Sequence, residues 1–140
     1  MVLDKNLFKK EEIISSFNFA RSSDIVYSEV IPINEFKKIE SENTFIINKN
    51  SETVFYKIRN FEVSENNIIF CNLYMVDSLF SLLKDINNLV NLKLITGQSD
   101  NSITKKLFLL KPNCISEWYS TNVAHSDKNL IPIPLGLAND

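Results

Sequence analysis

The feature that most constrains the fold is an alternation of strand-like and helix-like segments between residues 67 and 120. Three short runs rich in apolar residues are predicted to be strands: 67–72, 91–96 and 114–120. Between them, residues 76–86 carry apolar side chains on one broad helical stripe, and residues 102–110 predict a second helix that Pro112 stops. Strands joined by helices pair in parallel through right-handed crossovers. The sequence therefore predicts an α/β fold, a Rossmann-like and mainly parallel sheet with flanking helices.

The first sixty residues predict further elements of the same fold. A helix is expected over residues 10–20, a strand over 24–31 that Pro32 closes, and a short helix after it with Asn34 as N-cap. Residues 44–48 and 53–58 predict two more strands. With 140 residues, 44% of them hydrophobic, the chain is long enough for one domain with its own core. We expect a single α/β domain spanning residues 1–140.

Charge and cysteine content exclude several classes of protein. The 15 Lys and Arg against 17 Asp and Glu give a formal net charge of -2, which supplies no attraction for duplex DNA or an anionic membrane. No run of about 18 apolar residues predicts a membrane span, and no secretory leader is recognisable. Cys71 and Cys114 lie in apolar runs, which is typical of reduced core cysteines. We expect a cytoplasmic protein that does not bind nucleic acid.

Polar residues follow three of the predicted strands. They are Asn72 with Tyr74 after the first strand, residues 96–101 after the second and residues 120–125 after the third. Ligands of open parallel sheets bind outside the carboxyl ends of the strands, so we expect these segments to share one rim. Gly97 suits an abrupt turn there that leaves amides available to an anion at the next helix, whereas Asp100 either contacts a ligand or simply caps that helix.

Two further side chains near this rim each have two interpretations. His125 precedes Asp127 by two residues, as a general base held by a carboxylate would, but an idle loop histidine would have the same sequence. Trp118 belongs either to the core or to the rim, where it would stack on a sugar or a base. The sequence contains no His/Cys cluster for a metal and no nucleophile elbow, so we expect no metal site, and no cofactor is predicted.

Four segments carry a resemblance to a known family. They are Leu94-Ile-Thr-Gly-Gln-Ser-Asp100, Trp118-Tyr-Ser-Thr-Asn-Val123, His125, and Ile131-Pro-Ile-Pro-Leu-Gly-Leu-Ala-Asn139. Together they resemble the exostosin-like glycosyltransferases of large viruses, phages and marine microbes, over roughly the last third of the chain. One departure is Leu135, where the family more often has Ile.

The resemblance implies two Rossmann-type halves facing a cleft, with the nucleotide sugar bound mainly by the later half. This chain would match the earlier, acceptor-side half of a longer protein and would not be active alone. His125 or Asp100 would be the base, and Gly97 and Gln98 would contact substrate. The motif positions that would line the cleft are Ser99, Asp100, Trp118, Asn122, His125, Gly136 and Asn139. The implied partners are a nucleotide sugar and a glycan acceptor.

A second hypothesis belongs to another functional class. The run from Leu130 to Leu137 is too apolar to suit a free tail, and an unpaired strand edge tends to pair with another chain. These features are typical of a non-catalytic α/β interaction domain that associates through its C-terminal end, for example as a homodimer.

Overall fold

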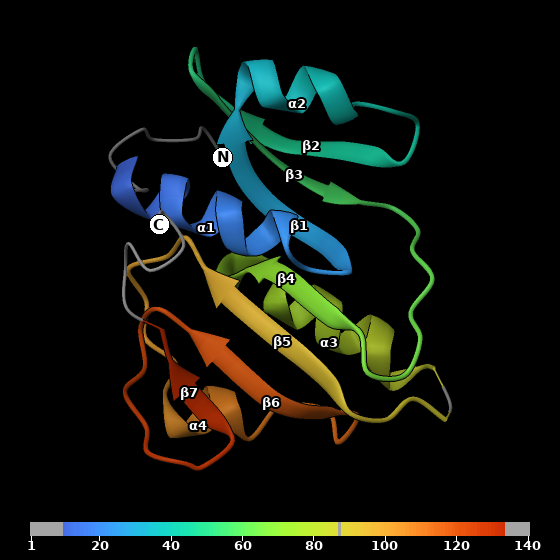
Figure 1. Ribbon diagram of the computed structural model, residues 1–140, viewed down its shortest axis with the longest axis vertical. Helices are drawn as coiled ribbons and strands as arrows, with labels where there is room; N and C mark the ends of the chain where they lie inside the picture. Colours follow the sequence, from blue (N-terminus) through green and yellow to red (C-terminus); the bar gives the residue numbers. More distant parts are fainter. Residues whose placement is uncertain (1–9, 87, 134–140) are drawn as a thin grey trace.

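The computed structural model describes residues 10–86 and 88–133, which form a mixed sheet of seven strands flanked by helices (Figure 1). In chain order the strands are β1 (Ile25–Pro32), β2 (Thr44–Lys49), β3 (Thr53–Ile58), β4 (Ile68–Asn72), β5 (Leu92–Gly97), β6 (Ile115–Ser120) and β7 (Leu130–Pro132). The helices are α1 (Lys10–Arg21), α2 (Ile33–Ile39), α3 (Val76–Lys84) and α4 (Lys105–Phe108), and a 3₁₀ turn, η1 (Leu73–Met75), precedes α3.

The sheet order is β2-β3-β1-β4-β5-β6-β7. The five strands from β1 to β7 in that order pair in parallel, as the alternation of strands and helices predicts. The remaining two strands, β2 and β3, form an antiparallel hairpin that joins the sheet at β1. The predicted α/β class with a mainly parallel sheet is confirmed.

Two predicted helix starts are wrong. Pro32, not Asn34, precedes α2, and Asn34 lies inside that helix. The helix predicted over residues 102–110 is confined to α4, because Ile103 is still extended and forms a parallel bridge with Val123. The N-cap of α4 is Thr104, whose hydroxyl accepts a hydrogen bond from the Leu107 amide at 3.2 Å. Asp100 therefore does not cap this helix.

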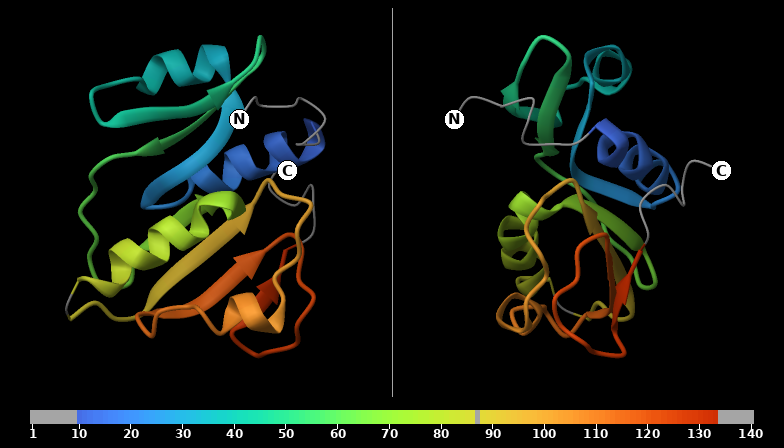
Figure 2. Two further views of the ribbon diagram at one scale, coloured as in Figure 1. Left: turned by 180° about the vertical axis from the view of Figure 1, so that it is seen from behind. Right: turned by 90° about the vertical axis from the view of Figure 1, so that its left-hand side faces the viewer.

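The two faces of the sheet are covered unequally (Figure 2). Helices α3 and α4 lie on one face, where the apolar stripe of α3 buries Val76, Leu79, Phe80 and Leu83. The predicted stripe is too broad, since Leu82 and Ile86 are exposed. On the other face α1 contacts β1, β4 and β5.

The burial of alternate side chains in β5 shows the unequal cover of the two faces. Leu92 and Leu94 are fully buried, whereas Lys93 and Ile95, which alternate with them, are only half-buried. Because successive side chains of a strand point to opposite faces, the face opposite α3 and α4 is incompletely covered over β5 and β6. None of the described helices is long and apolar enough to cross a membrane.

Candidate functional site

The three polar segments predicted to share a rim do meet at the carboxyl ends of β4, β5 and β6. Side-chain hydrogen bonds link them in pairs: Asn72 Nδ2 to Gln98 Oε1 at 3.2 Å, Thr96 Oγ1 with Ser120 Oγ at 2.9 Å, and Asn122 Nδ2 to the Ser99 carbonyl at 2.7 Å. Residues far apart in the sequence are thus tied into one polar network. Most of this network is buried, so it fixes the loops as much as it offers groups to a ligand.

The chain turns sharply at Gln98, just after the end of β5. The φ of 62° at Gln98 lies in the left-handed region, which costs free energy for any residue with a Cβ. The sharp turn was expected at Gly97, but Gly97 is still part of β5, where it pairs with Asn72. The Gln98 side chain is fully buried, and its amide accepts from the Val30 amide and donates to the Val30 carbonyl, both at 2.7 Å. Gln98 therefore acts as a brace for β1, and its amide group is not exposed to a ligand.

Trp118 belongs to the core. Its side chain is fully buried, its indole nitrogen donates to Thr96 Oγ1 at 2.8 Å, and its ring packs edge-on to Phe80 at 5.4 Å. An indole enclosed in this way cannot stack on a sugar at the surface. The assignment of Trp118 to the substrate-binding residues is corrected, and the core interpretation holds.

The other predicted binding residues are placed differently. Ser99 is buried, and its hydroxyl accepts a hydrogen bond from the Asn101 amide at 3.0 Å. Asn122 is half-buried and reaches the Ser99 carbonyl. Gly136 and Asn139 lie outside the described residues.

Asp100 and His125, the two candidate bases, are more accessible than the network between them. Asp100 is exposed, and His125 is half-buried with its ring 5.6 Å from that of Phe108. In the part of the chain that the structure describes, His125 makes no hydrogen bond to Asp127, whose carboxylate accepts from the Asn129 amide at 2.8 Å. Instead, His125 lines a hollow of about 520 Å³, together with the other residues of 123–127, Leu130 and Pro132.

No family model, curated protein or solved structure matches this chain. Among the described residues, no group of three or more His, Cys, Asp or Glu side chains is arranged to hold a metal ion. The two cysteines are free thiols, and burial raises the pKa of both.

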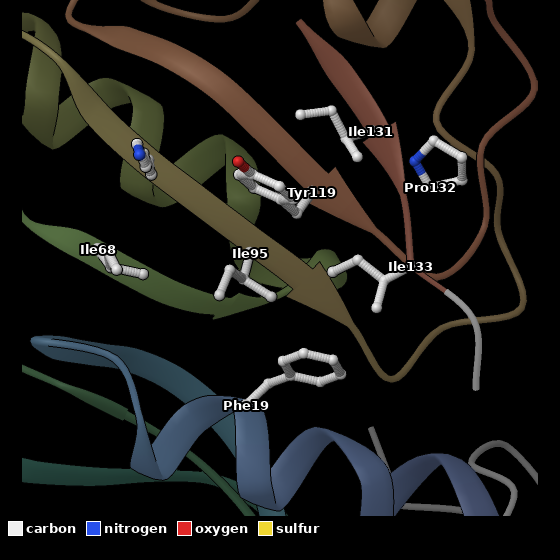
Figure 3. Close-up of a pocket in the computed structure, with 8 residues that line it drawn as sticks. Phe19, Ile68, Ile95, Tyr119, Ile131, Pro132 and Ile133 are labelled. Atoms are coloured by element: carbon white, nitrogen blue, oxygen red, sulfur yellow. The ribbon is translucent and has the colours of Figure 1, made fainter. Parts of the chain in front are cut away.

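A second candidate site, an apolar groove, was not predicted from the sequence (Figure 3). It measures about 440 Å³ and lies on the incompletely covered face of the sheet, beside Phe19 of α1. Apart from Phe19 it is lined by Ile68, Lys93, Ile95, Tyr119, Ile131, Pro132 and Ile133. A cross-strand row, Ile95 opposite Tyr119 and Tyr119 opposite Ile131, forms its floor. That row is a signal the sequence contained, but only the register of three strands reveals it.

One edge of the groove is charged. Lys93 Nζ lies 3.5 Å from Glu117 Oε1, and both side chains are partly exposed. The Tyr119 hydroxyl donates to the same carboxylate at 3.3 Å, and partial burial together with that carboxylate raises the pKa of Tyr119. Parallel sheets are normally covered on both faces, so an apolar groove with a polar edge is a candidate binding surface.

Proposed function

We propose that this chain is the acceptor-side part of a glycosyltransferase that uses a nucleotide sugar. The observation that supports the proposal most is the hydrogen bond from Asn122 to the Ser99 carbonyl. It joins two segments that resemble the family at one edge of a parallel sheet, where ligands of such sheets bind. The exposed Asp100 belongs to the first of these segments, and the half-buried His125 follows the second by two residues.

In the proposed reaction an acceptor hydroxyl attacks the anomeric carbon of the donor sugar. The hydroxyl proton passes to a base, and the nucleoside diphosphate leaves with the electron pair of the broken bond. His125 or Asp100 would be that base. Ser99 and Asn122 would hold the rim that positions the acceptor, while Gln98 supports the loop from behind.

Amide NMR spectra of the chain, recorded with a panel of monosaccharides, oligosaccharides and nucleotide sugars, test this proposal. We expect a glycan to shift the amides of residues 99–101 and 122–125. We also expect His125→Ala or Asp100→Ala to weaken that binding. Spectra that stay unchanged at saturating concentrations of every sugar would overturn the proposal.

The apolar groove favours a second candidate function, a non-catalytic interaction domain that forms a homodimer. Residues 131–133 contribute to the groove, and β7 is the edge strand of the sheet within residues 10–86 and 88–133. Lys93 and Glu117 lie side by side and carry opposite charges. In a dimer with a two-fold axis, Lys93 of each copy would face Glu117 of the other copy.

Sedimentation of the chain over a range of concentrations tests the dimer. We expect a dimer at high concentration that Ile131→Asp converts to a monomer, since a buried carboxylate would oppose association. Phe45→Asp, an equivalent change at an exposed apolar residue of β2, is the control and should leave the dimer intact. A monomer at all concentrations would remove this candidate.

A further inference from the structure

The turn after α4 exposes two leucines. Leu109 is 69% exposed and Leu110 is 48% exposed, and Leu109 is the most exposed large hydrophobic side chain among the described residues. The turn lies at the opposite end of α4 from its cap Thr104, away from the polar rim. Neither leucine has a role in the functions proposed above.

Hydrogen bonds hold this turn in place. The amide of Leu109 donates to the Lys105 carbonyl at 3.0 Å, and that of Leu110 donates to the Leu107 carbonyl at 3.0 Å. Phe108, between them and the core, is buried with its ring stacked 6.2 Å from that of Trp118. With Phe108 anchored inward, the two leucines that follow it are directed outward.

A neighbouring element adds apolar surface. Ile86, just beyond α3, is 39% exposed and lines one shallow hollow together with Leu109 and Leu110. Such clusters of exposed apolar side chains mark interaction surfaces more often than single ones do.

Lysines lie close to these apolar side chains, in the sequence or in the lining of the same hollow. Lys105 and Lys106 are exposed and lie at the start of α4, and the Leu109 amide donates to the Lys105 carbonyl, so Lys105 and Leu109 lie one helical turn apart. Lys84, at the end of α3, lines the same hollow. In the part of the chain that the structure describes, none of these three lysines is in an ion pair.

Lys111 directly follows the leucines in the chain and lines the same hollow. Its ammonium donates to the Ile115 carbonyl at 2.5 Å and lies 5.8 Å from the Phe108 ring. Partial burial lowers the pKa of Lys111, and the carboxylate of Asp127 opposes that shift. Asp85, next to Lys84, is the other acidic side chain beside the cluster in sequence.

We propose that the turn at Leu109 and Leu110, with Lys84, Lys105, Lys106 and Lys111, docks onto a membrane surface that contains anionic lipids. The arrangement matches the layers of such a surface. Apolar side chains of surface-bound segments reach about 5–10 Å into the boundary between headgroups and acyl chains, while basic side chains stay at the headgroups. The leucines would enter that boundary while the lysines meet the anionic headgroups.

The distribution of charge over the molecule decides which face would meet the membrane. The whole chain has a formal net charge of -2, so the surface outside the lysine cluster is net negative and is repelled by anionic lipid. The net charge by itself gave no reason to expect a membrane partner. The local cluster does, and it selects one face of the molecule.

Co-sedimentation with lipid vesicles tests the proposal. We expect the chain to bind vesicles that are one-third phosphatidylserine and two-thirds phosphatidylcholine, and not vesicles of phosphatidylcholine alone. Binding should weaken strongly at about 1 M salt, where the screening length falls to about 3 Å. Leu109→Ser with Leu110→Ser should lower the binding constant about tenfold or more. Lys105→Ser with Lys106→Ser should remove most of the dependence on phosphatidylserine.

A matched control separates docking from general hydrophobicity. Phe45 and Ile46 of β2 are 41% and 37% exposed and lie at the other end of the sheet. Phe45→Ser with Ile46→Ser should leave vesicle binding unchanged, and circular dichroism confirms that each variant folds. No binding to either vesicle, an equal loss in the β2 variant, or binding only to a soluble Glu-Leu peptide overturns the proposal.

Discussion

Gln98 combines a strained backbone with a structural side chain. In the described structure β1 is eight residues long, but its pairing with β4 stops at Ser28. Val30 lies beyond that point. The side-chain amide of Gln98 accepts a hydrogen bond from the backbone N–H of Val30 and donates one to the backbone carbonyl of Val30. A side-chain amide has the same donor and acceptor as a peptide bond, so Gln98 continues the sheet where β4 has ended.

We predict that Gln98→Ala lowers the free energy of unfolding by about 2–4 kcal/mol, because two buried backbone groups lose their partners. Gln98→Gly should be less destabilising by about 1 kcal/mol, since glycine adopts a positive φ without steric cost. Urea unfolding measures both. Asn101→Ala, in the same loop, is the control and should change stability by less than about 0.5 kcal/mol. Equal losses for the Ala and Gly variants would contradict the role assigned to the backbone.

Glu29 is an acidic side chain that is fully buried in the described structure. It forms an ion pair with Arg21 and accepts a hydrogen bond from the Tyr56 hydroxyl at 2.7 Å. Its second carboxylate oxygen has no hydrogen-bond partner. Burial raises the pKa of Glu29, and the charge of Arg21 only partly opposes this.

A raised pKa in the folded state has a definite consequence for stability. The contribution of Glu29 is fully present below its pKa in the unfolded chain and is lost as the pH rises through its pKa in the folded chain. Glutamine does not ionise, so we predict that Glu29→Gln gains stability relative to the natural chain as the pH rises from about 4.5 towards 7. Urea unfolding of both proteins at several pH values measures this difference, in which other titrating groups cancel. A difference that is constant across that range would contradict the prediction.

At the scale of elements, hydrophobic patterning predicted six of the seven described strands, missed β7, and was insufficient for helix starts. Runs such as 91–96 and 114–120 correspond to β5 and β6 within one or two residues, because short runs of strand-favouring residues between turn-forming residues are typical of strands. The start of α4 depends on a tertiary contact, the bridge between Ile103 and Val123, which no local pattern contains.

Thr104 and Asp100 provide a direct test of that correction. We predict that Thr104→Ala costs about 1 kcal/mol of unfolding free energy, because the Leu107 amide loses its cap. Asp100→Ala should cost less than about 0.5 kcal/mol, since Asp100 is exposed and does not cap the helix. Chemical denaturation of the two variants side by side measures this. A larger loss for Asp100→Ala would restore the cap predicted from the sequence.

At the scale of the whole molecule, the sequence located the rim but not the state of its side chains. Parallel pairing follows from the alternation of elements, so the meeting of residues 96–101 with residues 120–125 was predictable. Burial of Gln98 was not predictable, because it depends on the contact of its side chain with Val30 of β1. The sequence left two interpretations for Trp118, and its packing against Phe80 and Phe108 decides for the core. The apolar groove was missed because its floor comes from three strands that only the sheet register aligns.

The unequal cover of the two faces leads to a last prediction, made with two neighbouring residues of β5. Leu94 is fully buried beneath the helices, so Leu94→Ala should cost about 2–5 kcal/mol at any protein concentration. Ile95 points into the groove on the opposite face, so Ile95→Ala should cost about 1 kcal/mol in dilute solution.

If a second copy covers the groove, the cost of Ile95→Ala should grow with protein concentration while that of Leu94→Ala stays constant, because association stabilises only the folded dimer. Thermal unfolding of both variants over a hundredfold range of concentration measures the two costs. A cost for Ile95→Ala that does not change over this range would mean that the groove stays open to other occupants.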